Sequence, residues 1–302
     1  MEPPAAPAEP LPLRCAPAAE QREDPLFATA PPASRWLLIE TPTPWPRQAL
    51  TALTSASVAN LAAEVARLCV AAGIRPVLIR RHGRQDRSTR RWALVDSRPG
   101  QESIRWGDLS TDDQLLKVLD GTDQGTPSTD PIYLVCTHGR HDTCCAVRGR
   151  PAAAALTTAF PERTWECSHI GGDRFAANLV FLPHSLFYGH VPTAEAVALA
   201  TRYNEGVVVP KYLRGSGAHA PAVQAAQHFA REAGASLSVN ALHQTQVTRQ
   251  DPITWQIQLA ADPDHYTVVV TAIATTINAR MTCASQPPGH VTTFKRITSD
   301  FL

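Results

Sequence analysis

Three of the seven cysteines and two of the eleven histidines of this chain fall within ten residues, CTHGRHDTCC, which run from Cys136 to Cys145. Thiolates and imidazoles are good ligands for transition metals, and thiols also carry redox exchange. A further segment, CSHIGGDRF, adds Cys167, His169 and Asp173. These residue types leave three kinds of chemistry open: a metal or iron–sulfur site, a reactive thiol pair, or a disulfide.

The composition is that of an ordinary globular protein. The 302 residues are 44% hydrophobic, which is enough for a packed core, and at roughly 150 residues per domain the length suggests two domains. The net charge of +1 provides no bulk attraction to nucleic acid or to an anionic membrane, so we expect neither as a partner.

The start of the chain has neither a basic region nor an apolar run typical of a signal peptide, and the sequence contains no apolar stretch of 18 residues. We therefore expect a cytoplasmic protein. In that reducing compartment a cysteine cluster more often binds a metal or does redox chemistry than forms a disulfide, and seven cysteines cannot all pair.

Hydrophobic periodicity predicts two units of the same order after a disordered tail rich in proline and alanine at residues 1–34. The first unit, 35–126, comprises a strand at 35–39, a helix at 58–72, strands at 75–80, 90–96 and 103–107, and a helix at 110–120. The second, 127–205, comprises a strand at 131–136, a helix at 150–160 that starts near Pro151, a strand at 163–167, a hairpin at 178–191 and a helix at 193–204. Residues 206–302 add a helix at 220–234 and several strands. This order, β-α-β-β-β-α twice, predicts an α/β fold with a thioredoxin-like mixed sheet, in which the repeat suggests a duplication, and a small α+β extension at the C-terminus.

The cysteine-rich loops follow two strands of the second unit. Cys136 ends one predicted strand and Cys167 ends the next. Because parallel strands end at the same edge of a sheet, we expect their loops to face each other and to combine the cysteines with His138, His141 and His169. Gly171 and Gly172 allow positive backbone angles, so we expect them to let the chain approach a bulky cofactor.

The spacing does not by itself select one metal centre. A structural zinc site usually repeats a pair of ligands two to four residues apart, and the chain has no C-x-x-C motif. The long loop that ends at Cys144 and Cys145 could surround a larger group such as an iron–sulfur cluster. From the residues alone a cluster, a zinc ion and thiol chemistry all stay open.

Several motifs together resemble the sucrase/ferredoxin-like family over residues 14 to 300: RWLLIETPTPW, CTHGRHDTCC, CSHIGGDRFAANLVFLP and LFYGHV. The resemblance implies a thioredoxin-like [2Fe-2S] protein that transfers electrons to or from a redox partner protein. Eukaryotic relatives bind the cluster through two cysteines of C-[ST]-H-G-x-x-D-x-x-C and two histidines of H-x-G-G-H. Matched to this chain, the motifs fall on Cys136 and Cys145, and on His169 and Asp173.

Asp173 departs from the family pattern, which has histidine there, so the fourth ligand is open. Asp173 itself, Cys144 or Cys167 could fill the place. A thiolate matches iron better than a carboxylate does, and we favour Cys144 because it lies in the same loop as two expected ligands.

We expect an electron carrier that is not itself a catalyst. Two alternatives remain: a thiol–disulfide oxidoreductase that uses Cys144 or Cys145, and a zinc-binding protein. The stretch from Arg75 to Arg91 holds seven arginines and one aspartate. It could dock an acidic redox partner, although such a stretch is usually only solvated. Cys15 and Cys283 receive no role from the sequence.

Overall fold

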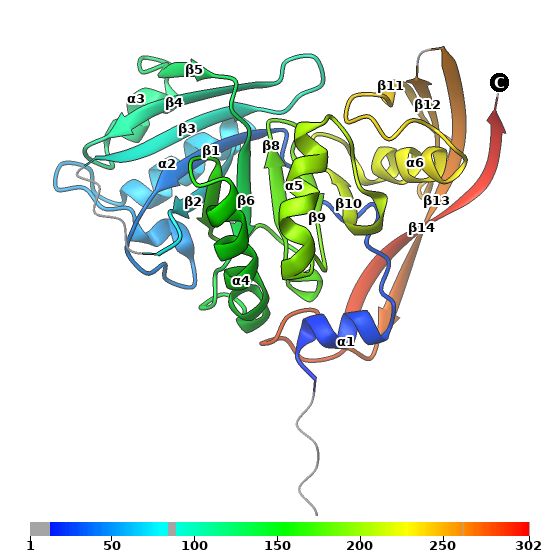
Figure 1. Ribbon diagram of the computed structural model, residues 1–302, viewed down its shortest axis with the longest axis horizontal. Helices are drawn as coiled ribbons and strands as arrows, with labels where there is room; N and C mark the ends of the chain where they lie inside the picture. Colours follow the sequence, from blue (N-terminus) through cyan, green and yellow to red (C-terminus); the bar gives the residue numbers. More distant parts are fainter. Residues whose placement is uncertain (1–12, 84–88, 262, 302) are drawn as a thin grey trace, which may run out of the picture.

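The computed structural model describes residues 13–83, 89–261 and 263–301, which form a ten-stranded mixed sheet and a four-stranded antiparallel sheet with six α-helices among the described residues (Figure 1). The first part of the chain forms α1 (Cys15–Gln21), β1 (Arg35–Glu40), α2 (Leu61–Ala71), β2 (Arg75–Arg80), β3 (Arg90–Asp96), β4 (Ser103–Leu109), α3 (Gln114–Leu119) and β5 (Thr126–Ser128). The middle forms β6 (Ile132–Cys136), α4 (Thr143–Ala159), β7 (Thr164–Cys167), β8 (Leu179–Leu182), β9 (Leu186–Tyr188), α5 (Ala196–Asn204) and β10 (Leu213–Ser216). The last part forms α6 (Pro221–Glu232), β11 (His243–Arg249), β12 (Thr254–Ala261), β13 (Asp264–Ile277) and β14 (Gly289–Phe301).

The large sheet repeats one topology. Its strand order is β10-β9-β8-β6-β7-β2-β1-β3-β4-β5. In the first half β1 pairs in parallel with β2 and antiparallel with β3, and in the second half β6 pairs in parallel with β7 and antiparallel with β8. The halves join where β2 and β7 pair antiparallel. The predicted order β-α-β-β-β-α is confirmed in both halves, as is the mixed α/β class.

The large sheet curls so that its two halves share a core. The rings of Trp36 in β1 and Phe187 in β9 lie 5.8 Å apart, although β1 and β9 are five places apart in the strand order. In a flat sheet that separation would be about 24 Å, since neighbouring strands lie about 4.8 Å apart. The rings of Trp106 in β4 and Trp165 in β7 stack at 5.4 Å on the same face. The inside of the curl is therefore filled with side chains from both halves.

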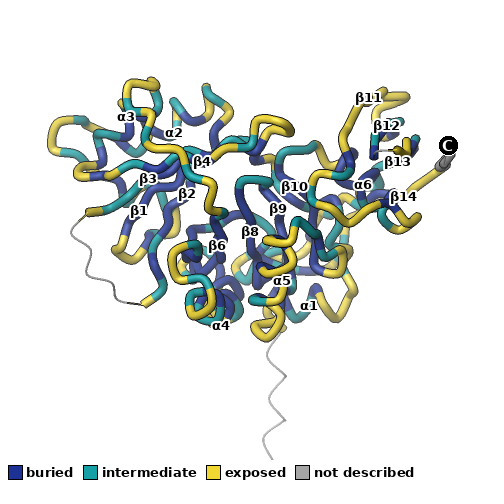
Figure 2. Tube along the Cα trace, turned by 45° about the horizontal axis from the view of Figure 1, so that its top comes forward, coloured by how far each residue is buried: buried dark blue, intermediate teal, exposed yellow. Residues whose placement is uncertain are grey.

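Helices cover the outer face of the curl. The buried side chains of α2 and α3 pack on one half of the sheet, and those of α4 and α5 pack on the other. The strands beneath them are the buried segments drawn dark blue in Figure 2. Alternating residues of each strand thus face the shared inner core and the helices, which is why these strands read as nearly continuous apolar runs.

The C-terminal sheet is separate and antiparallel, in the order β11-β12-β13-β14, and α6 packs its apolar face against it. The predicted α+β extension is confirmed in this respect. Its long strands β13 and β14 run back along the molecule, so the loop between them lies next to α1, at the other end of the chain (Figure 1).

The predicted disorder of residues 1–34 is wrong for the described part of that segment. Residues 15–21 form α1, and Cys15 is fully buried. Arg148 of α4 binds Glu20 through an Nη1–Oε1 contact of 2.5 Å, and further on the amide of Ala33 donates to the carbonyl of Gly217. These partners are more than a hundred residues away in sequence, so a local reading of proline and alanine content could not find them. Residues 1–12 lie outside the described residues.

The predicted start of the helix near Pro151 is also wrong. The helix α4 begins at Thr143, and Pro151 lies inside it. The side chain of Asp142 caps the helix by accepting a hydrogen bond from the amide of Cys144 at 2.8 Å. Asp is a favoured N-cap residue, so a local signal for the true start is present in the sequence. The predicted domain boundaries at 126 and 205 stay predictions; the large sheet runs across the first and takes β10 from beyond the second.

The arginines of the 75–91 stretch that the structure describes are engaged within the fold. Arg80 binds Glu166 at 2.8 Å, and Arg90 binds Asp112 at 2.7 Å. The guanidinium of Arg81 donates to three backbone carbonyls and lies 3.6 Å from the centre of the Trp165 ring. These contacts give no support to the idea of a freely exposed docking stretch; Arg84 and Arg87 lie outside the described residues. Across the described ranges, no helix combines the length and apolarity that a membrane crossing requires.

Candidate metal centre

Two neighbouring parallel strands bring the cysteine-rich loops together. Cys136 at the end of β6 is opposite Cys167 at the end of β7 in the β-sheet register. After β6 the chain leads into α4, and after β7 it leads into a 3-10 turn, Asp173–Phe175. Gly149 of α4 lies directly against the carbonyl of Cys136, where any side chain would overlap that oxygen. The first turns of α4 can therefore approach the end of β6 closely.

Four donor groups converge at this edge of the sheet. The ligand atoms of Cys136, Cys145 and His169 all lie within 4.8 Å of one another. The carboxylate of Asp173 joins them, with Oδ1 at 3.2 Å from the Sγ of Cys145 and 3.0 Å from the Nδ1 of His169. Cys136, Cys145 and Asp173 are buried, whereas the His169 side chain is 24% exposed. The site therefore offers two thiols, one imidazole and one carboxylate, and only the imidazole reaches solvent appreciably.

The two other histidines of the first loop have different positions. The ring of His141 stacks on that of His169, with centroids 3.7 Å apart, and its Nε2 lies 3.5 Å from Asp173. The ring of His138 is held at both nitrogens: Nε2 lies 2.9 Å from the carbonyl of Pro46, and Nδ1 accepts from the amide of His169 at 3.3 Å. His138 thus braces the two loops against each other, while His141 extends the donor group toward the surface.

The two thiols considered for the fourth position lie elsewhere. Cys144 follows Asp142 on the other side of the helix start, and its Sγ is 3.4 Å from that of Cys283. Cys167 is fully buried, and in the described part of the chain it belongs to none of the groups of converging donor atoms. Of the three alternatives, Asp173 is the one in contact with Cys145 and His169.

Gly171 and Gly172 adopt positive φ angles of 93° and 82°. A Cβ atom at Gly171 would lie 2.8 Å from the Pro31 ring, and one at Gly172 would meet the guanidinium of Arg214. The carbonyl of Gly171 also accepts a hydrogen bond from Arg214 at 2.9 Å. The glycines thus admit Pro31 and Arg214; their contact with a cofactor stays a prediction.

The site favours the thiolate form that metals bind. A hydrogen bond from the Cys145 thiol lowers the pKa of Cys136 well below its ordinary value, against the effect of burial, and the neighbouring His169 lowers it further. The same hydrogen bond raises the pKa of Cys145, which keeps the shared proton. A thiolate is the reactive and metal-binding form of cysteine, so the lowered pKa of Cys136 favours the form that could bind a metal.

The imidazole and the carboxylate form a second charged pair. Burial opposes the charged form of His169, but hydrogen bonds with Asp173 and Cys136 outweigh it and raise the pKa of His169 to about 9. Burial also opposes the charged form of Asp173, yet hydrogen bonds from His141 and His169 lower its pKa. Without a metal, these pKa shifts favour two anions, Cys136 and Asp173, one cation, His169, and a neutral Cys145 thiol, so the group keeps an excess of negative charge.

Arg214 supports the second loop, a role that the sequence did not reveal. Its guanidinium is buried and donates to the carbonyl and hydroxyl of Thr29, to the carbonyl of Gly171 and to the side chain of Asn178. Burial lowers the pKa of Arg214 to about 9. No local pattern marks this arginine, because its partners lie far away in the sequence, at Thr29 and in the loop between β7 and β8.

The donor set fits an iron centre. Two thiols and an imidazole are ligand types of [2Fe-2S] clusters, and the side chains that carry them here are mostly buried, which limits the access of water. A carboxylate oxygen is a harder donor than the histidine of the family pattern, but its position is compatible with completing the set.

Comparisons with known proteins identify a family and a relative of this chain. The sucrase/ferredoxin-like family matches residues 26–215, which include both loops. Over 98 residues the chain is 31% identical to "Altered inheritance of mitochondria protein 32" of Meyerozyma guilliermondii; the match covers 29% of this chain and 35% of that protein. The chain therefore spans about a third of the length of this curated relative. No solved structure matches. Since the family match covers well over half of the chain, this protein belongs to the sucrase/ferredoxin-like family.

Proposed function

We propose that this protein is a one-electron carrier whose [2Fe-2S] cluster is held by Cys136, Cys145, His169 and Asp173. The observation that carries the proposal is the convergence of two thiols, an imidazole and a carboxylate where β6 and β7 end. When bound, such a cluster stores and releases single electrons. The protein holds it, shields it from water and connects it to the surface.

The strand order of the large sheet supports the proposal. Each half of the large sheet has its strands in the order second, first, third, fourth, with the first two parallel. This is the arrangement expected of a thioredoxin-like unit, and we take the two halves to be a duplication. In the first unit the corresponding strand ends carry Glu40 and Arg80, so the metal-binding chemistry belongs to the second unit alone.

Asp173 replaces Cys144 as the fourth ligand that we favour. The choice rests on position, because Cys144 points into another group of thiols while Asp173 contacts Cys145 and His169. A carboxylate adds a negative charge that the histidine of the family pattern would not. The buried guanidinium of Arg214 nearby offsets part of this charge.

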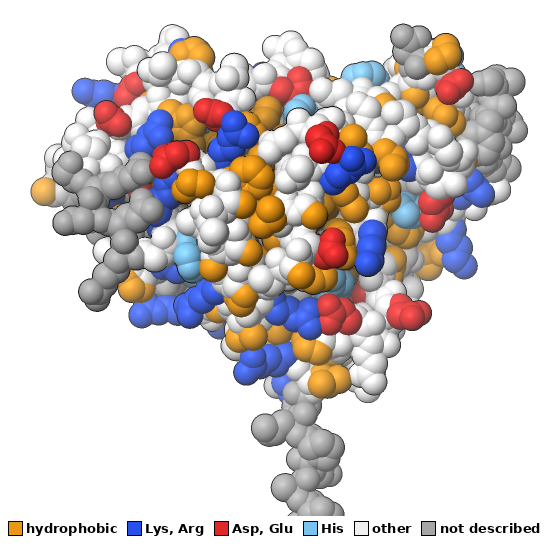
Figure 3. Space-filling view, in the orientation of Figure 1, with side chains coloured by type: hydrophobic (Ala, Val, Ile, Leu, Met, Phe, Trp, Pro, Cys, Tyr) orange, Lys and Arg blue, Asp and Glu red, His pale blue; other side chains and the backbone are white. Residues whose placement is uncertain are grey.

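Electrons would enter and leave through the histidine edge. The side chains of His169 and His141 are 24% and 30% exposed, and their rings stack. The neighbouring Arg140 is exposed, and Figure 3 shows Lys and Arg side chains gathered on the lower part of its view, around the position of α4 in Figure 1. We propose a redox partner protein with an acidic surface, whose rate of electron transfer falls as salt screens the attraction.

Metal analysis of anaerobically purified protein tests the proposal. We expect two irons and two acid-labile sulfides per chain, visible absorbance, and a paramagnetic signal on reduction. Cys136→Ser, Cys145→Ser and Asp173→Ala should each lose iron, while Cys69→Ala, which alters a buried core thiol far from the site, should keep it. Stoichiometric zinc without sulfide would instead favour a zinc-binding protein. Full iron content in Asp173→Ala, with loss in Cys144→Ala or Cys167→Ala, would restore a thiolate as the fourth ligand.

The thiol–disulfide oxidoreductase is less well supported. Cys144 and Cys145 are 2% and 0% exposed, and a thiol that attacks a substrate disulfide must be accessible. A colourless protein that reduces disulfides would favour this alternative. All seven cysteines are free thiols, which fits a reducing compartment, and we propose the cytoplasm.

A further inference from the structure

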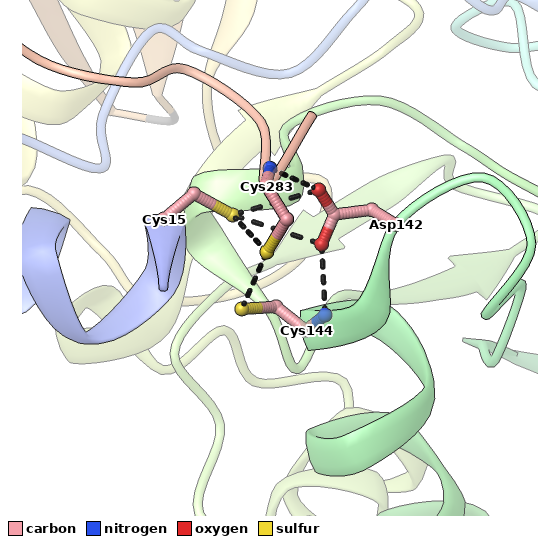
Figure 4. A group of neighbouring side chains, drawn as sticks. All are labelled: Cys15, Asp142, Cys144 and Cys283. Carbon is pink, nitrogen blue, oxygen red and sulfur yellow. Dashed lines mark hydrogen bonds between the residues drawn. The ribbon is translucent and has the colours of Figure 1, made fainter. Parts of the chain in front are cut away.

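A second group of metal-binding side chains lies on the other side of the α4 start. It consists of the thiols of Cys15, Cys144 and Cys283 and the carboxylate of Asp142, and Figure 4 shows all four pointing toward one another. We infer that these residues form a mononuclear zinc site, distinct from the proposed cluster.

The distances match the edges of a tetrahedral site. The Sγ of Cys283 lies 3.5 Å from that of Cys15 and 3.4 Å from that of Cys144. Both carboxylate oxygens of Asp142 lie 3.7 Å from the Sγ of Cys15. A zinc ion with Zn–S bonds of about 2.3 Å has ligand atoms about 3.8 Å apart. Small outward movements of the side chains would admit the ion.

The carboxylate is already oriented by the backbone. Asp142 accepts hydrogen bonds from the amide of Cys144 at 2.8 Å and from the amide of Cys283 at 2.6 Å. These bonds leave further lone pairs free on both oxygens. The same two residues thus supply both a thiol and an amide, which fixes the thiols and the carboxylate relative to one another.

The buried carboxylate and thiols favour a bound cation here. Cys15 and Cys144 are 0% and 2% exposed, Asp142 is 2% exposed, and Cys283 is partly buried. The nearby Arg148 is paired with Glu20. A divalent ion would compensate the charge of the carboxylate and of the thiolates that form as it binds.

A zinc ion accounts for the three close thiols better than a disulfide does. The Sγ of Cys283 lies 3.4–3.5 Å from the other two sulfur atoms, far beyond a disulfide bond of about 2.05 Å, and three thiols cannot all pair. A sulfur-rich tetrahedral set selects zinc or iron, and four protein donors with no open position are typical of structural zinc.

The site would join parts of the chain that are distant in sequence. Cys15 begins α1, Cys144 is in the first turn of α4, and Cys283 lies in the loop between β13 and β14. The bound ion would therefore hold both the N-terminal helix and the C-terminal hairpin against α4. Because Cys145 follows Cys144 directly, the bound ion would also stabilise the first turn of α4, which carries the proposed cluster ligand Cys145.

The test uses the full-length protein, purified anaerobically from cells grown with added zinc chloride. We expect one zinc per chain in addition to iron and sulfide. Zinc X-ray absorption should show about three sulfur neighbours at about 2.3 Å and one oxygen neighbour at about 2.0–2.2 Å. Because this spectrum is measured on the unaltered chain, it does not depend on how a variant folds.

Variants then locate the ion. Cys283→Ser should lose the zinc and keep the iron and sulfide, and Cys15→Ala should do the same. Cys69→Ala is the matched control for Cys15→Ala, since Cys69 is also fully buried but lies in α2 and packs in another part of the core, and it should keep the zinc. Conversely, Cys136→Ser should lose iron and keep zinc, so failure of the cluster proposal is distinguishable from failure of this one.

Four results would overturn the inference. One is zinc that stays bound in Cys283→Ser, and another is imidazole ligation of the zinc, which would place it at His169. The third is a Cys15–Cys283 or Cys144–Cys283 disulfide in protein analysed without exposure to air. The last is more than two sulfides per chain, which would indicate a second cluster in place of the single ion.

Discussion

Replacing Arg214 by methionine should destabilise the protein strongly, because four acceptors around its buried guanidinium lose their donor at once. The guanidinium donates to Thr29 twice, to Gly171 and to Asn178, over distances of 2.6–3.0 Å. Hydrogen bonds from a charged group contribute about 1.5–3 kcal/mol each, so the four together are worth roughly 6–12 kcal/mol.

Removing the buried charge offsets part of this loss. Burial lowers the pKa of Arg214 from 12.5 to about 9, and at 1.36 kcal/mol per pKa unit keeping the group charged costs about 5 kcal/mol. The expected net loss for Arg214→Met is about 4 kcal/mol. For 302 residues, with an unfolding entropy of about 2.1 cal/mol/K per residue, this corresponds to a fall in Tm of about 6 °C.

The assay is urea and thermal unfolding of anaerobically purified protein, with iron content measured in parallel. Arg202→Met is the control, since this side chain is 53% exposed and makes a single ion pair with Glu205, which is worth less than about 1 kcal/mol. Arg214→Lys keeps the charge but not the planar fork of donors, so it should recover little of the loss. The reasoning is refuted if Arg214→Met is no less stable than Arg202→Met, or if Arg214→Lys restores full stability.

Two further predictions address the glycine turn and the response to acid. Gly172→Ala should be less stable than Gly206→Ala and should lose iron. Both positions have positive φ, but a Cβ at Gly172 would meet the guanidinium of Arg214, whereas a Cβ at Gly206 would meet nothing within 4 Å. Equal urea midpoints for the two variants would contradict this prediction. Burial lowers the pKa of His219 from 6.5 to about 4. Between these two pH values the unfolded chain binds a proton that the folded chain does not. The free energy of unfolding should therefore fall by about 2 kcal/mol as the pH drops from 7.5 to 5. His219→Gln should remove that part of the pH dependence, and an unchanged difference between the urea midpoints at the two pH values would show that another group is responsible.

The order of strands and helices in both units could be predicted from the sequence, because it depends on local patterns. Strands such as "RWLLIE" and "IYLVC" are short apolar runs flanked by polar or turn residues, and the helix at α5 shows a clear helical period. The place of Cys136 at a strand end follows from the same pattern. The family resemblance, which rests on short contiguous motifs, was likewise visible in the sequence and is confirmed over residues 26–215.

The start of α4 was predicted wrongly although its signal is local. Asp142 is a favoured N-cap residue, but proline is common in the first turn of a helix, so the start was predicted near Pro151, which lies in the interior of the helix. The error mattered for the site, because it left Cys144 and Cys145 in a loop. On a helix, adjacent side chains point about 100° apart, since a turn takes 3.6 residues, so the two thiols belong to different groups of donors.

Only the tertiary structure decided what surrounds these thiols. Cys15 and Cys283 are 268 residues apart in sequence, and they meet because α1 and the β13–β14 hairpin both return to α4. The contact of Asp173 with Cys145 and the burial of Arg214 arise in the same way, from the packing of segments far apart in the chain. Periodicity and spacing determine which face of an element is buried. Which distant residue lies against that face depends on how the elements pack, and no local pattern of residues contains that information.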